Sequence, residues 1–151
     1  MVRLNRKVEY ALLALKYLSQ KTPGQLSTAK EIAEKFGCPY DATSRVLQIM
    51  AAHKILRSEQ GAHGGYMIVK DLSRISFLSL NEMILGPVGV ARCLQKDGDG
   101  ECELISTCNI MTPVRNLNAR LNSFLRELNL SEVLGLAVAH PSTFHQLGVQ
   151  E

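Results

Sequence analysis

Three of the four cysteines in the chain lie between positions 93 and 108, in a stretch rich in glycine and acidic residues. They are Cys93, Cys102 and Cys108. Thiolates are soft ligands that suit iron–sulfur clusters, zinc and copper(I), and a flexible polar loop can fold three of them around one centre. Isolated cysteines are more often buried and inert, but those lie in apolar runs, whereas Cys102 has acidic residues on both sides. The spacing and the setting therefore favour a ligand-bearing loop.

The composition predicts a chain that can form one compact domain and that has no membrane span. Of its 151 residues, 46% are hydrophobic, which suffices for a core. No apolar run approaches the length of a membrane-spanning helix, and the first residues lack the long apolar region of a signal peptide. We therefore expect a cytoplasmic protein. In that compartment thiols stay reduced, so clustered cysteines serve as metal ligands or redox sensors rather than as structural disulfides.

Positive charge is concentrated in the first half of the chain. Residues 1–70 contain 11 Lys and Arg against 5 Asp and Glu, whereas residues 71–151 contain 6 against 9. Such an asymmetry is typical of a segment that binds a polyanion, and a merely solvated basic surface has the same composition. Charge alone leaves both interpretations open.

Apolar residues recur at helical spacing in three segments of this basic half, over about residues 5–20, 29–36 and 41–53. The second segment begins with a capping box, Thr28-Ala-Lys-Glu31, and a glycine follows it. Two short helices joined by a tight turn are typical of a helix-turn-helix. We expect the last helix to bury Ala42, Val46, Leu47, Ile49 and Met50. On its outer side it would offer DNA the polar residues Tyr40, Thr43, Ser44, Arg45 and Gln48.

Residues 56–70 contain two strand-like runs around a loop with three glycines, which predicts a β-hairpin. Directly after a helix-turn-helix, such a hairpin is typical of a wing. Its glycines would permit positive φ and a close approach of the backbone to phosphate. At the tip lie Gln60 and His63, and near the N-terminus Arg3 and Arg6 are further candidates for phosphate contacts.

The second half is predicted to carry the cysteine loop between two helices. A capping box, Ser79-Leu-Asn-Glu82, would start a short helix, and Thr112-Pro113 would start a long one. Apolar residues of the long helix alternate at spacings of three and four, the pattern of a coiled-coil seam, which favours a dimerisation helix over packing within the chain. The seam consists of Val114, Leu117, Leu121, Phe124 and Leu128.

The predicted fold is mainly α: a winged helix-turn-helix with a β-hairpin wing and a long C-terminal dimerisation helix. We divide the chain into a DNA-binding domain at 1–72, a short helix with the cysteine loop at 73–111, and the dimerisation helix with a short capping helix at 112–138. The tail at 139–151 is rich in small and polar residues, and we expect it to be disordered.

This plan resembles the Rrf2 family of bacterial transcription regulators over about residues 1–135. The resemblance is carried by four stretches: Arg3-Leu-Asn-Arg-Lys-Val-Glu-Tyr-Ala-Leu at the start, Glu31-Ile-Ala-Glu in the second helix, Gly61-Ala-His-Gly-Gly-Tyr66 in the wing, and the loop from Cys93 to Cys108. It implies a homodimer on a partly palindromic DNA operator, with the third helix in the major groove and the wing along the minor groove. It also implies that the three cysteines hold an iron–sulfur cluster, 2Fe–2S or 4Fe–4S, whose state controls DNA affinity.

Three positions depart from the family pattern. The first two cysteines are separated by eight residues where the familiar spacing is five, Met111 replaces a histidine that some members carry, and Gln60 stands where many have an arginine. A fourth ligand would then come from elsewhere. In nitric-oxide-sensing relatives an acidic residue near the start of the first helix fills this role from the partner subunit, and Glu9 has the similar position here. An ordinary surface glutamate is the alternative.

The sequence thus predicts a DNA-binding repressor or activator that senses iron, redox state or nitric oxide through its cluster. A second hypothesis keeps the winged helix but replaces the cluster with structural zinc or a thiol redox switch. Structural zinc sites usually contain close cysteine pairs, which are missing here. An enzyme is disfavoured, because Cys38 has no positioned base near it in the sequence.

Overall fold

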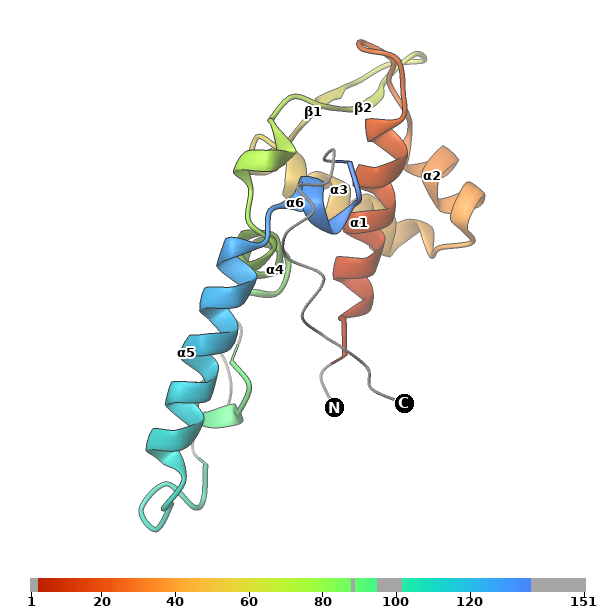
Figure 1. Cartoon of the computed structure of the whole chain (residues 1–151). Helices are drawn as coiled ribbons and strands as arrows, with labels where there is room; N and C mark the ends of the chain where they lie inside the picture. The colour runs from red at the N-terminus through yellow and green to blue at the C-terminus, as the bar shows by residue number, and fades with distance from the viewer. Residues whose placement is uncertain (1–2, 88, 95–101, 137–151) are drawn as a thin grey trace, which may run out of the picture.

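The computed structural model of the chain describes residues 3–87, 89–94 and 102–136. Within these ranges the chain is mostly helical, with one two-stranded hairpin (Figure 1). The elements in order are α1 (Arg6–Ser19), α2 (Ala29–Phe36), α3 (Tyr40–Ala52), β1 (Leu56–Glu59), β2 (Gly65–Ile68), η1 (Leu72–Arg74), α4 (Phe77–Leu85), η2 (Arg92–Leu94), α5 (Met111–Glu127) and α6 (Leu130–Val133).

The three helices of the basic half form where the sequence predicts them. Asn5 caps α1, because its side chain accepts a hydrogen bond from the amide of Lys7 at 2.9 Å. Thr28 caps α2 by accepting from the amide of Glu31 at 3.1 Å, and Gly37 ends α2 with a left-handed φ of 62°. The turn between α2 and α3 is therefore only three residues long, as a helix-turn-helix requires.

The predicted hairpin is present, and it is joined by a third extended segment. β1 and β2 are antiparallel, with Leu56 opposite Ile68 and Glu59 opposite Gly65. On the other side of β2, Ser27 and Tyr66 form an antiparallel bridge, with Tyr66 N donating to Ser27 O at 2.8 Å and Ser27 N to Tyr66 O at 3.1 Å. The wing is thus hydrogen-bonded to the residues that immediately precede α2.

One hydrophobic core joins α1, α3, α4 and α6. Val8 and Leu15 of α1, Leu47 of α3, Leu80 of α4 and Leu130 of α6 are all fully buried in it. Burying such side chains contributes roughly 1.5–3 kcal/mol each. Lys16 also donates to the carbonyl of Leu134 at 2.7 Å, so the chain after the long helix returns and is held against α1.

The two predicted helix starts in the second half are wrong by two or three residues. Ser76 rather than Ser79 caps α4, since the Ser76 hydroxyl accepts from the Ser79 amide at 3.1 Å. α5 begins at Met111, before Thr112-Pro113, and has no side-chain cap. For α6 the cap is Asn129, which forms a complete capping box with Glu132. At α4 the predicted cap, Ser79, lies within one turn of the true cap, Ser76.

α5 extends away from the rest of the molecule (Figure 1), and none of its residues is buried. Its C-terminal end is anchored where Phe77 N donates to Leu128 O at 2.7 Å and Leu130 N donates to Ile75 O at 2.9 Å. Across the described part of the chain, no helix is both long and apolar enough to cross a membrane.

Candidate nucleic-acid interface and cysteine loop

The two sides of α3 differ sharply in polarity. Thr43, Val46, Leu47 and Met50 form its buried side. On the other side Arg45 and Gln48 are exposed, Ser44 is half-buried, and Tyr40 is 55% exposed. Gln48 Nε2 donates to Ser44 Oγ at 3.3 Å, which orders two of the amide and hydroxyl groups available for base edges.

Thr43 does not lie on the outer side of α3, where the sequence predicted it to lie. Its side chain is only 1% exposed and faces the core. The hydroxyl oxygen finds no hydrogen-bond partner among the described residues. Of the residues expected to be buried, Ala42 and Ile49 are only half-buried, because the buried stripe is rotated toward Thr43.

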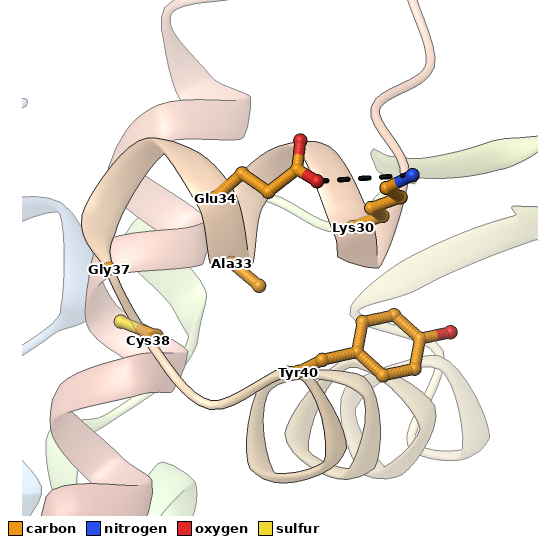
Figure 2. A pocket seen from close by; sticks show the side chains of 6 residues that line it. All are labelled: Lys30, Ala33, Glu34, Gly37, Cys38 and Tyr40. Carbon is orange, nitrogen blue, oxygen red and sulfur yellow. Dashed lines mark ion pairs between the residues drawn. The ribbon is translucent and has the colours of Figure 1, made fainter.

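A surface hollow of about 520 Å³ lies between α2 and α3 at the turn that joins them (Figure 2). Its wall includes Cys38 in the turn and Tyr40 at the start of α3, and Figure 2 shows these two side chains at opposite ends of the hollow. Lys30 and Glu34 border it from α2, 3.9 Å apart in an exposed ion pair. Cys38 is a free, half-buried thiol with a weak contact to the carbonyl of Phe36 at 3.8 Å.

The wing presents Gln60 and His63 as exposed side chains in the loop between β1 and β2. One wing position requires glycine for a reason other than the expected close approach of the backbone to phosphate. Gly65 has a φ of 149°, and a Cβ there would lie 2.7 Å from the Ser27 carbonyl oxygen. Glycine therefore permits the close approach of β2 to the backbone of Ser27. Partial burial of the Tyr66 hydroxyl on β2 raises the Tyr66 pKa, and the Tyr40 hydroxyl at the start of α3 is a second, smaller cause.

The start of α1 lies at the end of that helix remote from the hairpin (Figure 1). Arg3 and Arg6, both exposed, are therefore not brought together with the wing tip in one protomer. Arg6 instead pairs with Glu9 of the same helix at 2.7 Å, and the Glu9 side chain is 32% exposed. The Glu9 carboxylate is accessible, but it is already paired with the Arg6 guanidinium.

The three loop cysteines are all half-buried free thiols. Cys93 lies in η2, and the segment before it is held against the long helix, because Val90 N donates to Asn118 Oδ1 at 3.1 Å. Cys102 begins a series of turns in which its carbonyl accepts from Ile105 N at 2.9 Å, and Cys108 lies just before α5. The long helix thus positions both arms of the loop.

The donor chemistry of this loop suits an iron–sulfur cluster, since the loop carries three cysteines that form no disulfide. The positions of the described residues do not assemble such a centre in one protomer: no three His, Cys, Asp or Glu side chains among them lie close enough to hold a metal ion. Residues 95–101, which separate the first two cysteines and include three acidic residues, lie outside the described ranges.

Sequence reasoning missed a second polar centre, on the Glu31 carboxylate. Tyr17 of α1, Lys21 after α1, and Ser27 before α2 all donate to the same carboxylate oxygen. The sequence signal was the Thr-x-x-Glu pattern, but that pattern indicates a local cap. Its reciprocal half does not form here, because Glu31 turns to these distant donors instead.

A helix-turn-helix whose polar helix lies beside a two-stranded wing defines a winged-helix DNA-binding protein. The profile of the Rrf2 family, described as an iron-dependent transcriptional regulator, matches residues 4–135, so the chain belongs to the Rrf2 family of bacterial DNA-binding transcription regulators. The family description and the names of the two relatives given below are those of transcriptional regulators.

Individual relatives agree with this assignment. A Mycobacterium tuberculosis protein named as an HTH-type transcriptional regulator is 28% identical over 138 residues, covering 91% of this chain and 84% of the relative. The HTH-type transcriptional regulator IscR of Yersinia pestis is 26% identical over 133 residues, covering 88% and 79%. Among solved structures, CymR, the global cysteine regulator of B. subtilis, has a TM-score of 0.65 at 16% identity and covers 91% of this chain and 99% of its own. That likeness shows the fold alone.

Proposed function

We propose that this chain is a cytoplasmic homodimer that binds a double-stranded DNA operator through α3 and the wing, under the control of an iron–sulfur cluster held by the cysteine loop. The observation that carries the proposal is the set of three free, half-buried thiols on a loop whose two arms are attached to α5. The description of the family as iron-dependent supports it.

Base edges would be read by Ser44, Arg45 and Gln48, with Tyr40 beside them, because these side chains line the polar side of α3. Wing backbone amides and the exposed tip residues Gln60 and His63 would set the register on the phosphates. Phosphate contacts by Arg3 and Arg6 stay a prediction that the position of their segment does not support.

Cys93, Cys102 and Cys108 would hold the cluster, with Glu9 of the partner subunit as the fourth ligand. When bound, the cluster would supply a centre that responds to iron supply, oxidation and nitric oxide. The chain contributes the thiolates, the Asn118 contact that holds the first arm, and a carboxylate that must first leave Arg6. The 2.7 Å ion pair between Arg6 and Glu9 therefore opposes ligation by Glu9. Because this pair is exposed to solvent, breaking it costs only a modest free energy.

A second hypothesis is a winged-helix regulator with zinc or with a thiol redox switch in the same loop. Its thiol-switch form needs no metal centre, which the described residues of one protomer do not assemble, and the three loop cysteines are free. Both hypotheses share the same DNA interface, so the cofactor alone separates them.

Anaerobic purification with iron, sulfide and zinc analysis tests the cofactor. We expect a brown protein with iron and sulfide, and we expect Cys102→Ala to lose both while Cys38→Ala keeps them, because Cys38 lies in the helix-turn-helix turn. A colourless protein with stoichiometric zinc, or with neither metal, would replace the cluster by one form of the second hypothesis. Operator affinity that is the same with and without iron would contradict control by the cluster.

A further inference from the structure

We propose that Glu31 is a positioning residue for DNA recognition: its carboxylate joins α1, α2 and the wing, and thereby sets where the wing lies relative to the recognition helix. The inference uses only the DNA binding that family membership gives, and it does not depend on what the cysteine loop holds. Glu31 is not proposed to touch DNA.

One oxygen of Glu31 receives three donors from outside its own helix. Tyr17 donates its hydroxyl from α1, Lys21 Nζ lies at 2.9 Å, and Ser27 Oγ at 3.3 Å. The ionised carboxylate is favoured in this setting, since the Tyr17 hydrogen bond, followed by the contacts of Lys21 and Ser27, lowers the Glu31 pKa. Hydrogen bonds to a charged acceptor are stronger than those between neutral groups.

The donors are themselves held in place. Lys21 Nζ lies 4.4 Å from the centroid of the Tyr17 ring, and its pKa is raised by hydrogen bonds to Tyr17 and then Glu31. The Tyr17 ring meets the Phe36 ring edge-on, with centroids 5.7 Å apart. This packing connects the last turn of α1 with the last residue of α2.

Ser27 is the link from this centre to the wing. It is fully buried, its side chain contacts Glu31, and its backbone makes both hydrogen bonds to Tyr66 of β2. A Cβ at Gly65 would lie 2.7 Å from the Ser27 carbonyl oxygen, so the bridge brings the two backbones close together next to a glycine. Displacement of Ser27 would therefore move the wing relative to α2 and α3.

The experiment compares Glu31→Gln and Tyr17→Phe with Glu34→Gln, a control that removes the same charge from an exposed ion pair on the same helix. Affinity is measured for a duplex selected by the wild-type protein from a random pool and for a scrambled duplex of equal length, across salt concentrations. Exchange of the Tyr66 and Ser27 amide hydrogens reports the bridge, and exchange of the Leu80 amide reports the core.

We expect Glu31→Gln and Tyr17→Phe each to weaken binding to the selected duplex about tenfold, with scrambled-duplex affinity and salt slope unchanged. The Tyr66 and Ser27 amides should exchange faster while the Leu80 amide does not, and Glu34→Gln should match the wild type. Equal weakening on both duplexes together with faster Leu80 exchange would overturn the proposal in favour of a merely structural role. Tighter binding to both duplexes would overturn it in favour of simple charge repulsion, and unchanged amide exchange at the bridge would overturn it whatever the DNA result.

Discussion

Thr43 shows how residue type and helical phase can disagree. Its neighbours Ser44 and Arg45 are polar, and threonine is a common DNA-contacting residue. Residue type therefore favoured a position for Thr43 on the outer face of α3. Positions 43, 46, 47 and 50, however, share one face at a spacing of three and four, and this phase decides its burial. The buried hydroxyl lacks a partner among the described residues, a costly arrangement in a protein core.

We expect Thr43→Val to raise the free energy of unfolding by about 1 kcal/mol, because valine keeps the shape of threonine and removes the unsatisfied hydroxyl. Urea denaturation measures the change. Thr112→Val, at an exposed position in the first turn of α5, should change stability by less than about 0.5 kcal/mol. Operator affinity should stay at the wild-type value, and a selective loss of affinity in Thr43→Val would return this residue to the DNA interface.

Residue types singled out the cysteine loop, since three thiols in a polar stretch have few structural explanations, and its ligand role stays a prediction. They did not identify the Glu31 centre, because its donors, Tyr17, Lys21 and Ser27, come from the end of one helix and the loop before the next. Their convergence depends on how α1 lies against α2, which no local pattern records.

At the scale of elements, apolar periodicity predicted the order and type of the larger elements, whereas helix starts depended on which of several polar residues acts as the cap. Ser76 and Ser79 compete at α4, and the long-range hydrogen bond from Phe77 N to Leu128 O decides for the earlier start. The same kind of tertiary contact joins Ser27 to the hairpin. A third strand made of a single bridge has no sequence periodicity by which it could be predicted.

Within one chain, the apolar seam of α5 is left largely uncovered. Leu117 and Phe124 are 52% and 57% exposed, and Val114 and Leu121 are only half-buried, although all four lie on one stripe. Apolar side chains at this spacing are stabilised when a second helix covers them. A second copy of α5 would do so and would bring two cysteine loops near one another.

We expect Leu117→Asp to weaken dimerisation by roughly 100-fold or more, because pairing would bury an unpaired carboxylate. Asn116→Asp adds the same charge one residue away, on the side opposite the seam, and should leave the dimer intact. Analytical ultracentrifugation measures both. The monomer should keep its helical circular dichroism, since α5 contributes no buried residue. A Leu117→Asp protein that remains fully dimeric would remove α5 from the proposed interface.

At the scale of the whole molecule, the two ends of α1 lie near different parts of the structure. Its last turn lies at the wing and the Glu31 centre, while its first turn lies toward the end of the molecule where the cysteine loop and the start of α5 are found (Figure 1). A change at the cysteine loop that displaced the first turn of a partner's α1 would therefore act on the helix that, by our proposal, helps to position the wing through Tyr17. Ligation by Glu9, as proposed, would thus couple the state of the partner's cluster to the position of the wing.

Mixed dimers test whether Glu9 serves the cysteines of its partner. We expect Glu9→Ala and Cys102→Ala homodimers each to hold a short-lived cluster or none. A heterodimer of the two, isolated with different affinity tags, should regain one stable cluster, because the intact cysteines of one subunit meet the intact Glu9 of the other. Ligation within a subunit predicts no rescue, since neither chain then has a complete set. As a control, Glu34→Ala, which removes an exposed glutamate from α2, should give a homodimer with wild-type cluster lifetime. Iron content per dimer and the decay of cluster absorbance in air measure the outcome, and a rescued heterodimer with one cluster would establish that the site belongs to two chains.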